Sequence, residues 1–255
     1  MAGKLFLSDL DDTCGGINWA YRKSIALAYA LLVDEIRQKP PEIEPFFRAA
    51  REVSGELVKR RGQTRGVWGD TLLETYRYFC DEYGVAPRQE TEAKVYEIGM
   101  AVYTADFHLF DRTREALLFL REQNDRVVIV TNCEEETQPI KMESADITDL
   151  VDSVYCTPHG KAETLKRLAR DWAGETYGIG DNALTDGTPL KGFGRFLLVD
   201  HGPFADSRAD GLELPPTRTI HNLGDIVDNY GMLQDPETWR PERMLEPLSE
   251  LGFHR

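Results

Sequence analysis

The chain has 255 residues, of which 41% are hydrophobic and 29% charged, values typical of a soluble globular protein. Its formal net charge of −14 argues against non-specific nucleic-acid binding and against an anionic membrane surface, because both need a basic footprint. No apolar run approaches the ~18 residues that a membrane span needs, and no signal peptide precedes the first predicted strand. The cysteines form no metal motif or disulfide framework, which favours the cytoplasm; they are Cys14, Cys80, Cys133 and Cys156.

An acidic turn follows the first predicted strand. The apolar residues at positions 5–7 predict a strand that is buried on both faces. Asp9, Asp11 and Asp12 follow where such a strand must end, and ligands of open α/β sheets bind at the carboxyl ends of the strands. Asp9 and Asp11 would point the same way in an extended segment, and a divalent cation is the simplest means of keeping both ionised. The alternative interpretation is a solvated acidic turn.

Helical periodicity dominates the next part of the chain. The spacing of apolar residues predicts four helices, and no strand pattern interrupts them. The predicted ranges are residues 17–39, 42–61, 70–83 and 88–105, with Asp70 as the N-cap of the third helix. Because these helices follow the first strand directly, they form an insertion beside the Asp9 and Asp11 turn.

From Phe107 onwards, predicted helices and strands alternate. Helices are expected over residues 113–123, 134–145, 161–172 and 225–230, and strands over residues 126–130, 153–156, 176–179, 195–199 and 219–220. Such alternation predicts a parallel sheet with helices on both faces. The expected architecture is an α/β core domain of residues 1–16 and 109–230, a helical cap domain of residues 17–108, and a C-terminal tail of residues 231–255 packed on the core.

Further polar groups follow strand-like runs. Thr131 and Asn132 follow the run RVVIV, where a hydroxyl and amides can cradle an oxyanion, although Thr131 also suits a helix N-cap. Lys161 opens a predicted helix and can reach over the sheet edge, although a solvated lysine is the simpler reading. Gly180 and Asp181 follow the run YGI, with Asp186 five positions after Asp181, although an Asx-type turn is common there. Their order and placement together indicate one site.

These residues match the motifs of the haloacid dehalogenase-like hydrolase superfamily, which the chain resembles. The matching positions are residues 9–13 (DLDDT), Thr131, Lys161, and Gly180-Asp181 with Asp186. The helical insertion between the first two motifs is similar to the helical, C1-type cap of that family. The resemblance therefore implies an α/β fold, with a Rossmann-like parallel sheet and an inserted all-helical cap domain.

The resemblance also implies a phosphatase-type enzyme that uses Mg²⁺. By this resemblance, Asp9 is the nucleophile that forms an aspartyl-phosphate, and Asp11 protonates the leaving alkoxide and then activates water. Mg²⁺ would be held by the Asp9 carboxylate, the Asp11 backbone carbonyl and Asp181, because hard cations take oxygen ligands. Asp186 would support this site by orienting water ligands or a nearby lysine.

The substrate is expected to be a small phosphorylated metabolite. By the same resemblance, Thr131, the Asn132 amide and Lys161 bind its phosphoryl oxygens. Specificity is expected to reside in the cap, where the one local basic run covers residues 59–68. We expect this loop to face the nucleophile, with Arg65 or Trp68 touching the leaving group; the alternative is a solvated helix end with a packed tryptophan.

Other functions stay open at the level of sequence. A 2-haloacid dehalogenase needs an aspartate nucleophile but no acid for an alkoxide, so Asp11 counts against it. A phosphomutase would return the phosphoryl group to substrate instead of to water. A non-catalytic phosphate-ligand binding protein would be free to lose Asp9, Asp11, Lys161 or Asp181, yet all four are present. The sequence identifies neither the ester nor the oligomeric state, monomer or homodimer.

Overall fold

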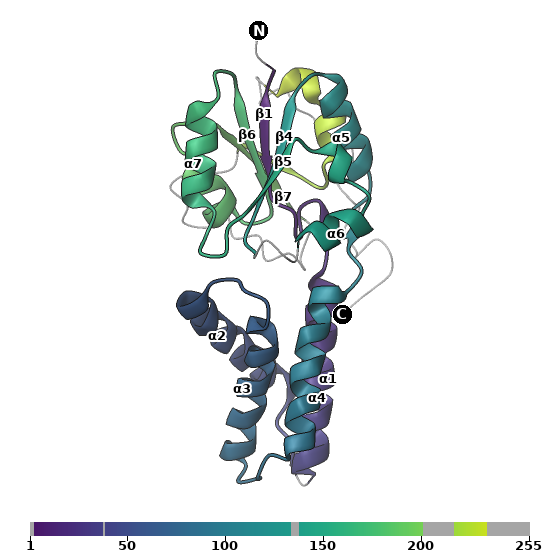
Figure 1. Cartoon of the computed structure of the whole chain (residues 1–255), viewed down its shortest axis with the longest axis vertical. Helices are drawn as coiled ribbons and strands as arrows, with labels where there is room; N and C mark the ends of the chain where they lie inside the picture. The colour runs from purple at the N-terminus through teal and green to yellow at the C-terminus, as the bar shows by residue number, and fades with distance from the viewer. Residues whose placement is uncertain (1–2, 38, 134–137, 201–216, 234–255) are drawn as a thin grey trace, which may run out of the picture.

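The computed structural model of the chain describes residues 3–37, 39–133, 138–200 and 217–233. Within these residues, a parallel sheet runs in the order β5-β4-β1-β6-β7-β8 (Figure 1). Its strands are β1 (Leu5–Ser8), β4 (Arg126–Thr131), β5 (Ser153–Cys156), β6 (Thr176–Gly180), β7 (Arg195–Val199) and β8 (Arg218–Ile220). Every strand that the sequence predicts is present, and the α/β class is confirmed. None of the helices in the described residues is both long and apolar enough to cross a membrane.

Helices cover both faces of this sheet (Figure 1). They are α5 (Thr113–Glu122), α6 (Gln138–Ser144), α7 (Ala162–Asp171) and α8 (Gly224–Asp228). Because side chains alternate along a strand, β1 serves two cores. Phe6 packs in the cluster that contains α5 residues, whereas Leu5 and Leu7 pack in the cluster that contains Leu165 of α7. This burial on both faces explains the unbroken apolar run of β1.

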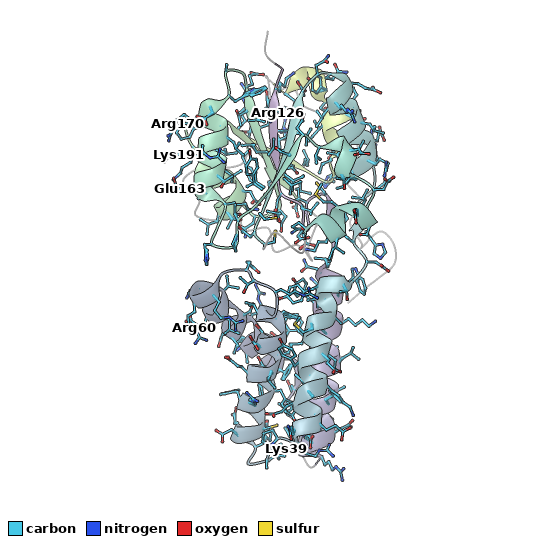
Figure 2. All side chains as sticks on the ribbon, viewed as in Figure 1. Lys39, Arg60, Arg126, Glu163, Arg170 and Lys191 are labelled. Carbon is cyan, nitrogen blue, oxygen red and sulfur yellow. The ribbon has the colours of Figure 1, made fainter. Side chains whose placement is uncertain are left out.

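Four helices pack together beyond the carboxyl edge of the sheet (Figure 1). They are α1 (Asn18–Ile36), α2 (Ile43–Arg61), α3 (Val67–Glu82) and α4 (Gln89–Met100), which is followed by the 3₁₀ turn η1 (Ala101–Thr104). Charged side chains such as Arg60 and Glu163 lie on the outside of the molecule (Figure 2). The described residues thus contain the predicted helical insertion, and its exact domain boundaries stay a prediction. The predicted tail lies outside the described residues from position 234 onwards.

A two-stranded ribbon that the sequence analysis did not predict joins the helices to the sheet. Its strands are β2 (Gly15–Gly16) and β3 (His108–Leu109), which pair antiparallel. A Cβ atom on Gly15 would lie 2.5 Å from the His108 carbonyl oxygen, so only glycine permits this close approach. The chain therefore leaves and re-enters the sheet domain at neighbouring points.

The predicted start of the third helix is wrong. Gly66 precedes α3 with a φ of 97°, in the left-handed region, and the helix begins at Val67. Asp70 lies inside α3 instead of capping it, and its carboxylate is 2.5 Å from Arg61 Nη1 at the end of α2. A glycine turn thus starts the helix one turn earlier than the acidic residue suggested.

An almost buried carboxylate joins α1 to α4. Glu35 has a side chain that is 7% exposed, and its Oε1 accepts hydrogen bonds from Arg88 Nε at 2.7 Å and Thr91 Oγ1 at 2.6 Å. Burial favours the neutral acid, but these hydrogen bonds outweigh it and lower the pKa of Glu35. The ionised carboxylate therefore stabilises the packing of α1 on α4.

Replacing Glu35 by glutamine should lower the free energy of unfolding at pH 7 by about 1–2 kcal/mol, because the acceptor of the hydrogen bonds from Arg88 and Thr91 loses its negative charge. A carboxyl with a lowered folded-state pKa stabilises the fold above its unfolded pKa, which is about 4.3. That stabilisation is lost as the pH falls through the folded-state value. Urea unfolding of both proteins between pH 3 and pH 7 should therefore show the difference shrinking in acid. A pH-independent difference, or an equal loss in the exposed Glu44→Gln control, would contradict this explanation.

Candidate active site

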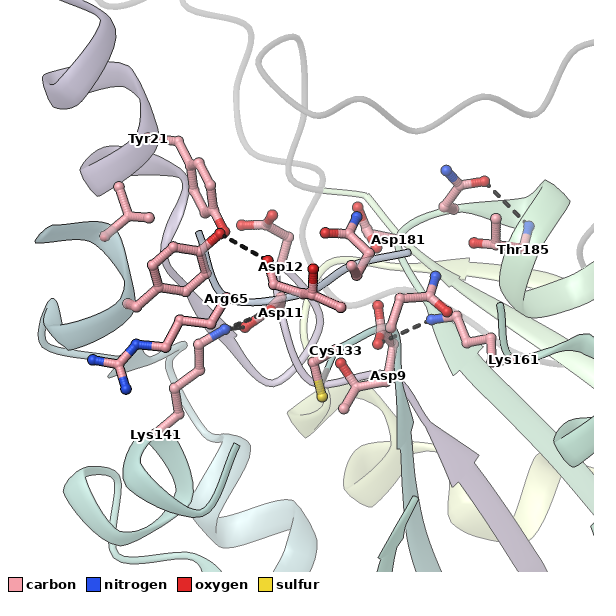
Figure 3. A pocket seen from close by; sticks show the side chains of 17 residues that line it. Asp9, Asp11, Asp12, Tyr21, Arg65, Cys133, Lys141, Lys161, Asp181 and Thr185 are labelled. Carbon is pink, nitrogen blue, oxygen red and sulfur yellow. Dashed lines mark hydrogen bonds and ion pairs between the residues drawn. The ribbon is translucent and has the colours of Figure 1, made fainter. Parts of the chain in front are cut away.

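The register of the sheet brings the predicted motif residues to one edge. Ser8 at the end of β1 pairs with Ile129 of β4 and with Ile179 of β6. Because these strands are parallel, the residues that follow them leave the sheet side by side. A pocket of about 380 Å³ opens at this edge (Figure 3). The predicted residues that line it are Asp9, Asp11, Thr131, Asn132, Lys161, Asp181 and Arg65.

Lys161 lies between two carboxylates. Its Nζ is 2.9 Å from Asp9 Oδ1 and also contacts Asp186 Oδ1. The lysine is 3% exposed, and burial, which favours the neutral amine, is outweighed by the two carboxylates, so its pKa is raised. Burial, which outweighs the attraction of Lys161, raises the pKa of Asp9 to about 6, and the nearby charges of Asp186 and Asp11 contribute to this rise. Lys161 is therefore a buried cation, and the alternative interpretation of a solvated lysine does not hold.

Asp186 supports Lys161 instead of facing the pocket. One carboxylate oxygen contacts Lys161 and lies 3.3 Å from Thr185 Oγ1, and the other accepts a hydrogen bond from Asn182 N at 3.0 Å. A Cβ atom on Gly180 would lie 2.1 Å from Asp186 Oδ2, so glycine is required where the fourth motif begins. The carboxylate is thus engaged by protein partners, and its supporting role stays a prediction.

Asp181 brings a third carboxylate beside those of Asp9 and Asp186. Its backbone N–H donates to Thr13 Oγ1 at 3.1 Å, and no cation lies within ion-pair distance of its side chain in the described part of the chain. Burial, followed by the charges of Asp9 and Asp186, raises its pKa to about 8. The carboxylate oxygens of these three residues lie within 4.8 Å of one another, which leaves their negative charge incompletely balanced. A hard divalent cation with oxygen ligands fits this set.

The turn after β4 offers hydrogen-bond donors to the pocket. Thr131 is 1% exposed, and its Oγ1 accepts a hydrogen bond from Gln138 Nε2 at 3.3 Å, which leaves its hydroxyl hydrogen free to donate. The Thr131 carbonyl oxygen accepts from Thr157 N at 2.9 Å, so the turn is fixed to the end of β5. Asn132 Oδ1 lies 3.3 Å from Thr157 Oγ1, which positions its amide beside the pocket. This geometry suits an oxyanion.

Lys141 is a charged pocket residue that the sequence analysis missed. Its Nζ lies 2.8 Å and 2.7 Å from the two carboxylate oxygens of Asp11 (Figure 3). The lysine belongs to α6, three residues after Gln138, which contacts Thr131. The signal that could have identified it is its position on the inner face of the helix that follows the second motif, because residues three apart on a helix share a face.

The helical insertion completes the far side of the pocket with Tyr21, Gln63, Thr64, Arg65, Val102 and Tyr103. The loop between α2 and α3 is fixed to the core, because Gln63 N donates to the Pro158 carbonyl oxygen at 2.7 Å. Trp68 does not line the pocket. It is 9% exposed, its Nε1 donates to Ser24 Oγ at 2.8 Å, and its ring meets Tyr21 edge-on. Of the two residues expected at the leaving group, Arg65 therefore lies at the pocket and Trp68 is packed in the cap, and contact of Arg65 with a leaving group stays a prediction.

Comparison with known proteins identifies the fold. No protein-family profile matches the chain, and no curated protein matches it. A haloacid dehalogenase-like family hydrolase from Xanthomonas campestris superposes with a TM-score of 0.70 and 16% identity, over 94% of this chain and 95% of that chain. The L-2-haloacid dehalogenase from Xanthobacter autotrophicus gives a TM-score of 0.58 and 16% identity, over 91% and 99%. A HAD phosphatase from Thermococcus onnurineus gives 0.53 and 17%, over 91% and 98%. These structures share a fold with this chain.

Proposed function

We propose that this chain, which has the fold of the haloacid dehalogenase-like hydrolases, is a Mg²⁺-dependent phosphomonoester hydrolase that acts on a small metabolite. The observation that supports a phosphatase over a dehalogenase is the Asp11 carboxylate. It lines the same pocket as Asp9, and displacement of a halide needs no acid for a leaving alkoxide. Hydrolysis of a phosphate ester needs such an acid, because an alkoxide is a poor leaving group.

The residues at the sheet edge fit a magnesium ion. Asp9, Asp181 and the backbone carbonyl of Asp11 would hold it, since Asp186 is engaged by Lys161. The ion would offset the repulsion between the Asp9 carboxylate and the phosphate that it attacks. The observation that supports this assignment is that carboxylate oxygens of Asp9, Asp181 and Asp186 lie within 4.8 Å of one another.

The chain's own residues account for each step. Asp9 attacks phosphorus, a bond forms between its carboxylate oxygen and phosphorus to give an acyl phosphate, and the bond from phosphorus to the alcohol oxygen breaks. Asp11 gives its proton to the departing oxygen and then takes a proton from the water that attacks the aspartyl-phosphate. That attack releases inorganic phosphate and restores the Asp9 carboxylate. Lys161, the Thr131 hydroxyl and the Asn132 amide stabilise the charge on the transferring phosphoryl group.

The first experiment is hydrolysis of a panel of phosphate esters, with Mg²⁺, with chelator, and with chelator followed by excess Mg²⁺. Phosphate release that disappears with chelator and returns with the ion would support the proposal, and the best ester would define the substrate class. A parallel panel of 2-haloacids should release no halide. Halide release without phosphate release would establish the dehalogenase instead. Binding of phosphate without turnover would establish the binding protein.

Arg65 is proposed to bind the leaving group. It is exposed, lines the pocket, and has no carboxylate partner among the described residues. Replacing Arg65 by alanine should raise KM for the best ester by about tenfold or more with little change in kcat, because a charged hydrogen bond is lost. Steady-state kinetics provide the measurement, with Arg60→Ala as the control, since Arg60 is exposed on α2 and lies outside the pocket. An unchanged KM in Arg65→Ala would exclude this role.

A further inference from the structure

Two separate lysines form ion pairs with acids at the pocket. Lys161 pairs with Asp9 and Asp186 at the sheet edge, whereas Lys141 pairs with Asp11 from the α6 side. We infer that Lys141 is a positioning residue for Asp11. It holds the Asp11 carboxyl group where that group can give a proton to the departing alcohol oxygen and take one from the attacking water. This inference rests on the proposed function, in which Asp11 is the proton donor and acceptor.

The burial of Lys141 indicates that its pairing is specific. The residue is 6% exposed, and removing an ammonium group from water costs several kcal/mol unless a counter-charge compensates. Asp11 provides that charge with both carboxylate oxygens, at 2.8 Å and 2.7 Å. The neighbouring acid, Asp12, is engaged elsewhere, because its Oδ2 accepts a hydrogen bond from Asn18 Nδ2 at 2.6 Å. Lys141 is thus directed at Asp11.

Lys141 lies on α6, a helix that packs into the main hydrophobic core. Its backbone carbonyl accepts a hydrogen bond from Ser144 Oγ at 2.8 Å, and Met142 beside it is 2% exposed in the main core. On the same helix, Gln138 contacts Thr131 at the phosphoryl turn. The position of the ammonium group is therefore tied to that of the turn that would bind the phosphoryl group.

Asp11 needs such a partner. Its side chain is 29% exposed, and Asp9, another acid of the same motif, repels it from two positions away. Without Lys141, the Asp11 carboxylate would be free to rotate into the open pocket. A proton donor must lie within hydrogen-bond reach of the oxygen that it serves, so loss of orientation should slow proton transfer more than substrate binding.

The test compares Lys141→Met and Lys141→Arg with the wild type on two esters. An alkyl phosphate needs a proton donor for its leaving oxygen, whereas p-nitrophenyl phosphate loses a stable phenolate and does not. For Lys141→Met, kcat/KM should fall about 10- to 100-fold on the alkyl ester, because part of the contribution of general acid catalysis is lost. On the aryl ester, kcat/KM should fall by less than about threefold. Lys141→Arg should recover part of the alkyl activity. The inhibition constant for inorganic phosphate should stay within about twofold, because the phosphoryl site is intact.

Double variants separate positioning from a direct role. In an Asp11→Asn background, Lys141→Met should add less than about a twofold loss, because both changes disable the same function. An equal loss on both esters, a weaker phosphate affinity, or a full additional loss in the Asp11→Asn background would overturn the inference. Lys94→Met is the matched control, since Lys94 is 55% exposed on α4 in a pair with Glu90.

Crystal structures provide a readout that does not depend on activity. In Lys141→Met, the Asp11 carboxylate should leave its present position while Asp9 and Lys161 keep theirs, and Lys141→Arg should retain it. An unmoved Asp11 carboxylate in Lys141→Met would overturn the inference even in an active phosphatase. If the wild type cleaves no ester but Asp11 moves in Lys141→Met, the proposed function fails while the positioning contact stands.

Discussion

Replacing Asp9 by asparagine should lower kcat for ester hydrolysis by about 10⁴-fold or more, as expected when the nucleophile of a covalent mechanism is removed. The amide has nearly the same shape as the carboxylate but cannot form the bond to phosphorus. The fold should survive, because burial raises the pKa of Asp9 to about 6. Burying a neutral amide at this position therefore costs less free energy than burying the carboxylate. Lys161 keeps Asp186 as its partner.

Two measurements check this result. Phosphate release from the best ester gives kcat, and mass spectrometry of acid-quenched enzyme should detect a phosphoryl group on wild type but not on Asp9→Asn. Asp171→Asn is the control, because Asp171 is an exposed residue at the end of α7. If Asp9→Asn retained substantial turnover with unchanged metal dependence, another residue would be the nucleophile and the proposed mechanism would be wrong.

The sequence predicted those parts of the fold that depend on local pattern. Apolar runs ended by polar residues predicted the strands, and β1 is buried on both faces as its sequence LFLS suggests. The register that joins Ser8 to Ile129 and Ile179 explains why motifs far apart in the chain meet at one edge. Residues that directly follow strands, such as Asp9 and Asp181, were therefore placed correctly at the pocket from their order alone.

The partner of an individual side chain in a distant segment could not be predicted in this way. The pairing of Lys141 with Asp11 joins residues that are 130 positions apart, and a lysine on a helix ordinarily predicts a solvated face. The ribbon of β2 and β3 has only two residues in each strand, too few for an alternating pattern. The prediction that Asp70 caps the third helix was wrong because an acidic residue suits both an N-cap and an ion pair. Only the contact with Arg61 distinguishes the two.

Replacing Lys161 by methionine should have the largest effect on stability at this site. The side chain is 3% exposed, and its loss would leave the carboxylates of Asp9 and Asp186 buried without their counter-ion. Breaking such a buried pair from one side typically costs about 3–5 kcal/mol. Phosphate release should also fall by about 10²-fold or more, because the cation that stabilises the transferring phosphoryl group is gone.

A second substitution separates lost charge pairing from lost packing. If unpaired charge is the cause, adding Asp186→Asn to Lys161→Met should recover part of the lost free energy of unfolding, because one buried carboxylate is neutralised. Urea unfolding of the single and double variants, without metal, measures the recovery. Lys166→Met on the same helix is the control, and its exposed pair with Glu163 should contribute no more than about 0.5 kcal/mol. No recovery in the double variant would show that the aliphatic stem of Lys161, and not its charge, holds the motifs together.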